Sequence, residues 1–199
     1  MADTPPPENS VHPKTRTEWR AWLESHHTQD NGVWLISYKK ATGLAYVDYD
    51  SAVEEALCFG WIDSVPRKLD ERRSMLYFAA RKAGSGWSRL NKQRIAKMLD
   101  AGLMMPAGLA KLDAAKQDGS WSALDAVENL EIPDDLAAAF AEYDQAAANF
   151  KAFPRSAKRG ILEWISNAKR PATRAKRIAE TAELAQQNIR ANQWPKRKP

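Results

Sequence analysis

Patterns typical of β-strands occur in this 199-residue chain only before residue 81. Val33 to Tyr38, Trp61 to Val65 and Ser74 to Ala80 are short runs rich in β-branched and aromatic residues. The turn from Asp70 to Arg73 precedes the last run and predicts an antiparallel hairpin. After Gly86 the apolar residues recur with the helical period. The sequence therefore predicts an α+β fold: a small antiparallel or mixed sheet of three or four strands with helices in the N-terminal half, and an all-helical C-terminal half.

Two capping boxes predict helices in the N-terminal half, one at Thr15 and Glu18 and one at Ser51 and Glu54. The second helix should begin at Ser51 and end near Gly60. In the first helix, four residues at i, i+3, i+4 and i+7 spacing should form one buried face: Trp19, Trp22, Leu23 and His26.

Five further helices are expected after Gly86. Their predicted bounds are residues 88–101, 106–118, 133–149, 156–168 and 172–188. Between residues 120 and 133 the helical pattern lapses, which indicates a domain boundary.

The predicted organisation has four parts. Residues 1–14 contain four prolines and should form a disordered arm. Residues 15–119 should form the α+β domain, and residues 120–192 a helical C-terminal domain that either stands alone or packs with the first as one unit. Residues 193–199 form a basic tail.

Charge alternates along the chain in four blocks. Residues 1–63 contain 5 Lys and Arg against 10 Asp and Glu, and residues 64–99 contain 10 against 2. Residues 100–150 contain 2 against 10, and residues 151–199 contain 13 against 3. One interpretation is a basic surface for nucleic acid or another polyanion. The favoured interpretation is that the blocks compensate one another, because the net charge is only +5.

The single cysteine, Cys58, excludes an intramolecular disulfide, and the first ten residues lack the basic start and apolar run of a secretory signal. These features predict a cytoplasmic protein. No apolar run approaches the roughly 20 residues that cross a bilayer, so we expect no membrane insertion.

The sequence predicts no metal site and no cofactor. The three histidines stand at positions 12, 26 and 27 without a second cysteine, which does not match zinc-ligand spacing. No glycine-rich loop of the phosphate-binding or dinucleotide-binding kind is present. Cys58 should be buried and unreactive, because it lies near a helix C-terminus, where the helix dipole disfavours a thiolate.

Glu54, Glu55 and Asp63 are the acidic residues considered for acid–base chemistry. Glu54 is explained by its predicted cap, and Asp63 precedes Arg67 and Lys68, which favours an ion pair or a turn. We therefore predict no catalytic residue.

The stretch from Arg81 to Arg94 is the best candidate for a ligand site. A glycine-flanked turn leads into a helix N-terminus, where free backbone N–H groups attract anions, and Trp87 offers a ring on which a flat ligand stacks. The competing interpretation takes Ser88 as a helix cap, Trp87 as its hydrophobic staple and the cations as a solvated face. The predicted ligand- or anion-binding residues are Arg81, Lys82, Ser85, Trp87, Ser88, Asn91 and Asp63.

Four segments carry a family resemblance. They are VEEALCFGWID at 53–63, RKAGSGWSRLNKQR at 81–94, AGLMMPAGL at 101–109 and SAKRGILEWISNAKRPATRAKRI at 156–178. Together they resemble the YdeI/OmpD-associated, or bacteriocin-protection, family over nearly the whole chain after residue 16. The chain has Ala79 and Ala80 where the family pattern commonly has a Thr-Pro pair.

The resemblance implies a bacterial protein linked to protection from bacteriocins or to envelope stress, and it implies no reaction. The expected function is thus that of a cytoplasmic, non-enzymatic protection or stress protein that binds a partner protein or an anionic ligand. Two alternatives remain: a protein that binds nucleic acid or another polyanion, and an enzyme acting on a small acidic substrate at Asp63 and Trp87.

Overall fold

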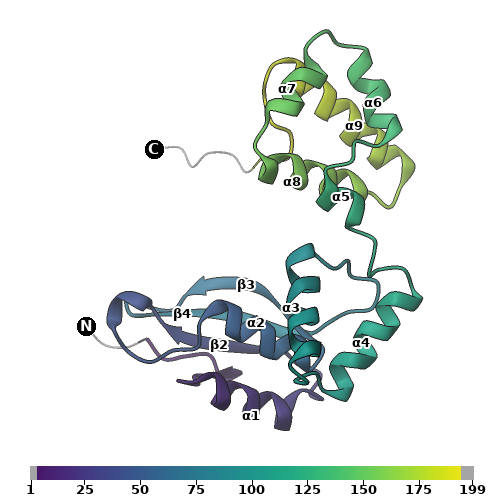
Figure 1. The fold of residues 1–199 in the computed structure, drawn as a ribbon. Coiled ribbons are helices and arrows are strands. Elements are labelled where there is room, and N and C mark those ends of the chain that lie inside the picture. The colour runs from purple at the N-terminus through teal and green to yellow at the C-terminus, as the bar shows by residue number, and fades with distance from the viewer. Residues whose placement is uncertain (1–3, 194–199) are drawn as a thin grey trace. The chain divides into compact units, whose positions relative to one another are not determined.

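A computed structural model describes residues 4–193 of the chain, which divides into two compact units, residues 1–123 and 124–199 (Figure 1). The division lies in the stretch between residues 120 and 133 where the helical pattern lapses. The first unit contains the sheet, and the second is helical, which confirms the predicted fold class. Of the expected basic tail, residues 194–199 lie outside the described residues.

The sheet has four strands in the order β1-β2-β4-β3. The strands are β1 (Ser10–Val11), β2 (Val33–Tyr38), β3 (Trp61–Lys68) and β4 (Arg73–Ala80). β1 is parallel to β2, whereas β2 and β3 are both antiparallel to β4. The sheet is therefore mixed, and the predicted hairpin is formed by β3 and β4.

Residues 4–14 differ from the disordered arm that we expected over residues 1–14, of which residues 1–3 lie outside the described part of the chain. Ser10 and Val11 pair with Trp34 and Leu35 on the open edge of β2, and Pro13 is buried. Further back, the Thr4 carbonyl oxygen accepts a hydrogen bond from Arg73 Nη2 at 2.8 Å. The edge strand supplies backbone partners to this proline-rich segment, which composition alone does not reveal.

The two helices next to the sheet are α1 (Arg16–His26) and α2 (Tyr49–Cys58), with a short 3-10 helix, η1 (Lys40–Thr42), before α2. Thr15 caps α1 as predicted, because its side chain accepts a hydrogen bond from the Glu18 N–H. The predicted capping box at Ser51 is wrong.

Asp48 is the N-cap of α2. Its side chain accepts hydrogen bonds from the backbone N–H and the hydroxyl of Ser51, which also lower the pKa of the Asp48 carboxyl. The helix consequently begins two residues before Ser51, at Tyr49.

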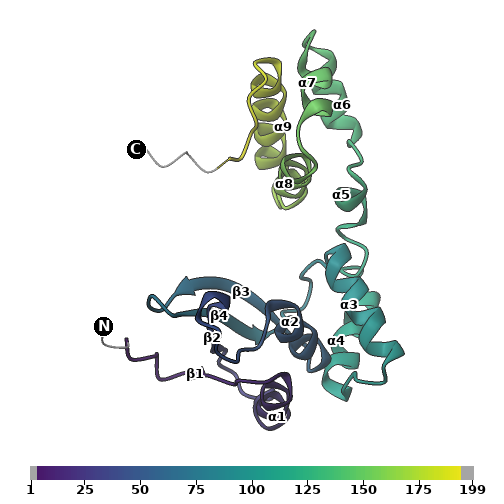
Figure 2. The same cartoon turned by 60° about the vertical axis from the view of Figure 1, so that its left-hand side comes forward.

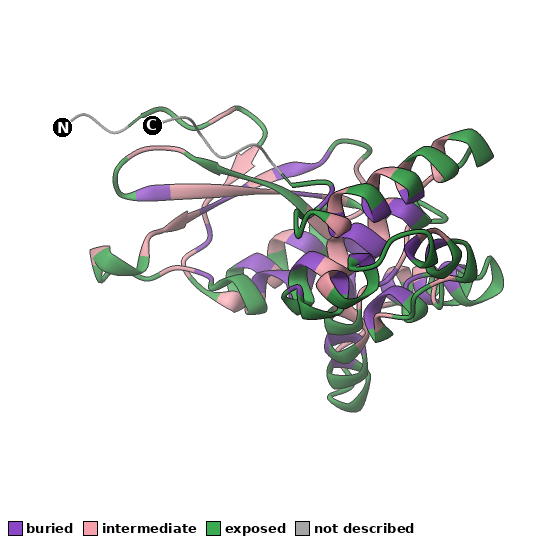
Figure 3. Cartoon of the chain, turned by 90° about the horizontal axis from the view of Figure 1, so that it is seen from above, coloured by how far each residue is buried: buried purple, intermediate pink, exposed green. Residues whose placement is uncertain are grey.

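Aromatic and aliphatic side chains from the sheet, α1 and α2 form the core of the first unit. Trp19 and Trp61 are fully enclosed, and their indole N–H groups donate to the carbonyl oxygens of Ala52 and His27 at 3.0 and 2.8 Å. α1 has buried and exposed sides, whereas α2 is buried on all sides from Ala52 to Cys58. Figure 3 shows buried and exposed residues along the chain. His26 lies outside the predicted buried face, since it is exposed and stacks on Trp22.

Two further helices complete the first unit, α3 (Arg89–Asp100) and α4 (Pro106–Gln117). Both lie beside α2 (Figure 2). Ser88 is the N-cap of α3, and its side chain accepts a hydrogen bond from the Asn91 N–H at 3.3 Å.

The second unit consists, within the described residues, of five helices. They are α5 (Asp125–Asn129), α6 (Asp134–Ala141), α7 (Ala146–Ala152), α8 (Arg155–Ser166) and α9 (Pro171–Gln186). Their core contains Leu136, Phe140, Phe150, Ile161 and Ile165. No helix among residues 4–193 has the length and apolar character needed to cross a membrane.

The single helix expected over residues 133–149 is wrong, because the chain breaks between α6 and α7. In a continuous helix, Phe140 and Phe150 would point about 80° apart. The break brings their rings to a centroid distance of 5.1 Å in one core. It also allows the Gln145 N–H to donate to the Gln186 side chain at the end of α9.

Candidate functional site

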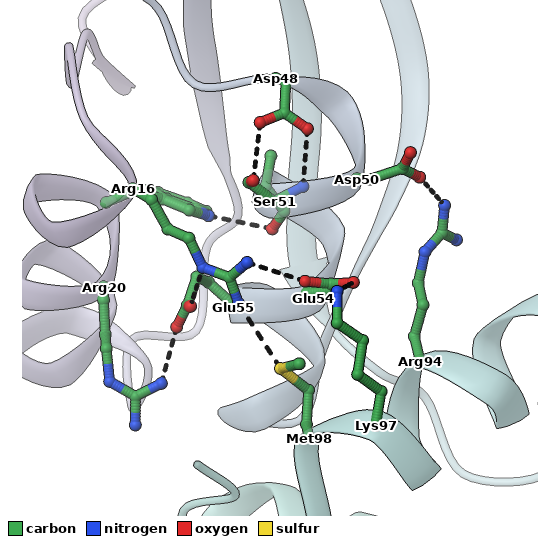
Figure 4. A network of polar contacts seen from close by, with 12 residues as sticks. Arg16, Arg20, Asp48, Asp50, Ser51, Glu54, Glu55, Arg94, Lys97 and Met98 are labelled. Carbon is green, nitrogen blue, oxygen red and sulfur yellow. Dashed lines mark hydrogen bonds and ion pairs between the residues drawn. The ribbon is translucent and has the colours of Figure 1, made fainter. Parts of the chain in front are cut away.

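Two adjacent carboxylates, Glu54 and Glu55, are buried on α2 with 5 and 2% of their surface exposed. Glu55 accepts from Arg16 Nε at 2.5 Å and from Arg20 Nη1 at 2.6 Å (Figure 4). Glu54 accepts from Arg16 Nη1 at 2.8 Å and from Lys97 Nζ at 2.5 Å. Buried carboxylates are tolerated when charged donors satisfy them. This cluster thus ties α1 and α3 to α2, and Glu54 is an ion-pair residue rather than a cap.

The charge blocks of the sequence meet in such pairs. Arg94 and Lys97 of the basic 64–99 block bind Asp50 and Glu54 of the acidic block before it. In the second unit, Arg159 pairs with Glu128 at 3.0 Å and Arg174 with Asp135 at 2.6 Å. These contacts support the interpretation that the blocks compensate one another.

A pocket of about 600 Å³ lies in the first unit. It is formed by β2, β3 and β4 together with the segment that leads from β2 into the first turn of α2. The apolar part of its wall contains Leu35, Val47, Ala52, Pro66, Met75 and Leu76. Its polar part contains Ser37, Tyr38, Lys39, Lys40, Tyr46, Tyr49, Asp63, Ser64 and Ser74.

Asp63 and Tyr49 are hydrogen-bonded to each other in the wall of this pocket. Tyr49 Oη donates to Asp63 Oδ2 at 3.0 Å, and the Arg94 guanidinium lies 5.5 Å from the centre of the Tyr49 ring. Burial raises the pKa of the Tyr49 hydroxyl, and the negative charge of Asp63 raises this pKa further. Tyr49 therefore remains a neutral donor that holds the Asp63 carboxylate at the pocket.

The pocket has a different charge at each end. Sheet pairing places Asp63 opposite Phe78 and Ser37 opposite Ser74, so the two rows are four residues apart along β4, or about 14 Å. Lys39 lies two residues after Ser37 in the sequence. Its Nζ donates to the carbonyl oxygens of Asp70 and Glu71, both at 2.9 Å. The acidic end and the end with Lys39 and Lys40 are separated by apolar wall.

The predicted site residues fall into two places. Arg81, Lys82, Ser85 and Trp87 lie together on the loop between β4 and α3. Ser88 is the N-cap of α3, and Asn91 lies in the first turn of this helix. Asn91 Oδ1 accepts a hydrogen bond from Arg94 Nη1 at 2.9 Å. Asp63 belongs to the 600 Å³ pocket instead.

Trp87 has only 1% of its surface exposed, so the expectation that a flat ligand stacks on it is wrong. The Arg81 guanidinium lies 3.8 Å from the centre of the Trp87 ring, and the Trp121 ring lies 5.2 Å away. These two side chains occupy the space that a ligand would need.

Cys58 is buried, as predicted. Burial raises the pKa of its thiol to about 11, and the charge of Glu55 acts in the same direction. The thiol is therefore protonated at neutral pH. Within residues 4–193, no three His, Cys, Asp or Glu side chains are grouped so that they could hold a metal ion.

Most of the pocket wall was not predicted from the sequence. Tyr38, Tyr46 and Tyr49 lie close together in the sequence, between the end of β2 and the start of α2. Aromatic residues that bear a hydroxyl and recur in a loop are a usable signal for a binding site. Ser64 and Ser74 carry no such signal, because only strand pairing brings them to the pocket.

Two family models match the chain. The model described as a domain of unknown function, DUF8412, matches residues 11–111, and the one described as bacteriocin-protection, YdeI or OmpD-associated, matches residues 129–188. No curated protein and no solved structure matches significantly. The match to the predicted family thus covers the second unit rather than nearly the whole chain, and the segments 53–63, 81–94 and 101–109 fall in the other model. The chain belongs to the DUF8412 family through its first unit, and its second unit confirms the predicted bacteriocin-protection, YdeI or OmpD-associated family.

Proposed function

We propose that this chain is a cytoplasmic protein of the bacteriocin-protection type that acts by binding a small dipolar ligand in the 600 Å³ pocket of its first unit. The protection role rests on the description of the family that the second unit matches. The binding role rests on the pocket, whose volume lies in the range of about 300 to 1,000 Å³ typical of small-molecule sites.

The arrangement of charges in the pocket supports a dipolar ligand. A protonated amine at one end of the ligand would bind the Asp63 carboxylate, and a carboxylate at the other end would lie near Lys39 and Lys40. The walls between them, including Leu35, Val47 and Leu76, favour an apolar body. A zwitterion such as a short apolar peptide fits these three requirements.

The alternatives from the sequence are less well supported. Arg81 and Arg94 are buried, and Arg94 pairs with Asp50, so the 81–94 stretch offers nucleic acid fewer free cations than its sequence suggests. An enzyme that uses Asp63 and Trp87 together is disfavoured because these residues line different pockets.

Binding of apolar tetrapeptides, which span about 14 Å when extended, tests the proposal. We expect such a tetrapeptide, present at about 100 times its dissociation constant, to stabilise the protein by about 2.7 kcal/mol, measured as a thermal shift. Asp63→Asn removes the charge that binds the amine and should weaken binding about tenfold or more. The matched control is Asp113→Asn, an exposed position on α4 outside the pocket, which should bind like wild type. Equal affinity of the Asp63 variant and wild type would contradict the proposal.

The protection role is tested in cells. A strain that lacks the gene should survive bacteriocin exposure less well than its parent, and wild-type protein should restore survival while the Asp63→Asn variant does not. Fractionation should place the protein in the cytoplasm. Unchanged survival of the deletion strain would exclude a protection role. If the Asp63→Asn variant restores survival, protection does not depend on ligand binding in the pocket.

A further inference from the structure

Three arginines are buried among residues 4–193, and one of them differs from the others. Arg73 donates from Nε to Asp70 Oδ2 at 2.7 Å, and Arg94 pairs with Asp50. Arg81, with 5% of its surface exposed, contacts no carboxylate of the described residues. Within residues 4–193, two of the three buried guanidinium groups thus have a paired counter-charge, and Arg81 has none.

The contacts of Arg81 satisfy only part of its guanidinium. Its Nη2 donates to the carbonyl oxygens of Ser85, at 3.2 Å, and Gly86. Its Nε is buried and finds no acceptor among the described residues. Desolvation lowers the pKa of this side chain to about 10. Enclosing a cation without a counter-charge costs free energy, and an unsatisfied buried polar group calls for an explanation.

A hollow of about 60 Å³ lies beside Arg81. Lys82 and Lys111 also line it, and the carboxylate among its lining residues is Asp118. Asp118 accepts from the Gly84 N–H at 3.1 Å and from the Ser120 N–H at 2.8 Å, so its oxygens are used to hold the surrounding backbone. Three cations against one carboxylate leave the lining with an excess of two positive charges.

We infer that this hollow binds a compact oxyanion, namely a phosphate group, with the Arg81 guanidinium as its principal donor. Guanidinium groups match the oxygens of phosphate in bidentate geometry, and Lys82 and Lys111 add point charges. The volume is about that of two water molecules and admits one such group. A phosphate carries about −1.5 to −2 charges at neutral pH, which matches the excess charge of the lining.

The test is a titration of the full-length protein with inorganic phosphate, at constant ionic strength maintained with chloride. We expect saturable binding, a rise in the melting temperature and a shift of the Arg81 Nε–H resonance in NMR spectra. Lys111→Gln should weaken binding by about tenfold, because one of the three cations is lost. Lys116→Gln changes an exposed lysine of the same helix that lies outside the hollow and should leave binding unchanged.

Arg81→Lys should abolish binding. If the Arg81→Lys protein does not fold, the result for Lys111→Gln decides the question. Similar affinity for sulfate supports an oxyanion site. The inference is overturned if phosphate acts no differently from chloride, if Lys111→Gln binds like wild type, or if acetate binds more tightly than phosphate. These outcomes are independent of the 600 Å³ pocket, which is tested through Asp63.

Discussion

Cys58 shows how one buried group makes the stability of this protein depend on pH. In the unfolded chain a cysteine thiol titrates near pH 8.5, whereas burial and the charge of Glu55 raise the pKa of Cys58 to about 11 in the folded protein. As the pH rises, the unfolded chain loses this proton first. The free energy of unfolding therefore has its full value below about pH 8.5 and falls as the pH approaches 11.

We predict that Cys58→Ala flattens this dependence. Between pH 8 and pH 11, wild type should lose on the order of 2 kcal/mol more of its free energy of unfolding than the variant does. Urea unfolding of both proteins at a series of pH values measures the difference. Other groups titrate equally in both proteins. If the free energy of unfolding falls by the same amount in wild type and in the variant, Cys58 does not cause the pH dependence.

The packing of α4 against the end of α2 depends on a glycine. A Cβ atom at position 108 would lie 2.2 Å from the Cys58 carbonyl oxygen, which also accepts a hydrogen bond from the Met105 N–H at 3.1 Å. Such an approach of one helix to the backbone of another is open only to a residue without a side chain. Gly108 thus sets how closely these two helices approach.

Gly108→Ala should lower the free energy of unfolding by about 1 to 3 kcal/mol, the usual cost of overpacking. Gly160→Ala is the matched control, because a Cβ there meets nothing within 4 Å and α8 gains helix propensity. We expect this control to be unchanged or up to about 1 kcal/mol more stable. Thermal unfolding followed by circular dichroism compares the two, and equal effects would argue against close packing at position 108.

At the scale of the whole molecule, residues 4–193 form two hydrophobic cores that share no residue. The first contains Trp19, Trp61 and Phe78, and the second contains Leu136 and Phe150. Separate cores are the physical basis of separately folding units, and a chain built in this way need not unfold in one step.

We therefore predict two calorimetric transitions. Phe150→Ala should destabilise the second unit by about 3 to 5 kcal/mol and lower one transition temperature only. Tetrapeptide binding in the first unit should be retained at temperatures below that transition. A single transition that shifts as a whole in the variant would show instead that the two cores unfold together.

Features encoded within a few neighbouring residues were predictable. The run VWLISY coincides with β2, and Thr15 and Ser88 cap the helices that follow them. Period, capping and turn chemistry act over one or two turns of chain, so they can be read without knowing the fold. Asp63, for which the sequence favoured an ion pair or a turn, instead accepts a hydrogen bond from Tyr49.

The remaining features depend on residues far apart in the sequence. Glu54 is held by Arg16 and Lys97, β1 needs the open edge of β2, and Trp121 from beyond α4 covers Trp87. The pocket around Asp63 exists because strand register aligns segments from three strands and a loop. Local sequence decides where most helices and strands form, whereas tertiary contacts decide the pairing of β1 and the break between α6 and α7. The packing of the elements also decides which side chains meet and which are left to bind a ligand.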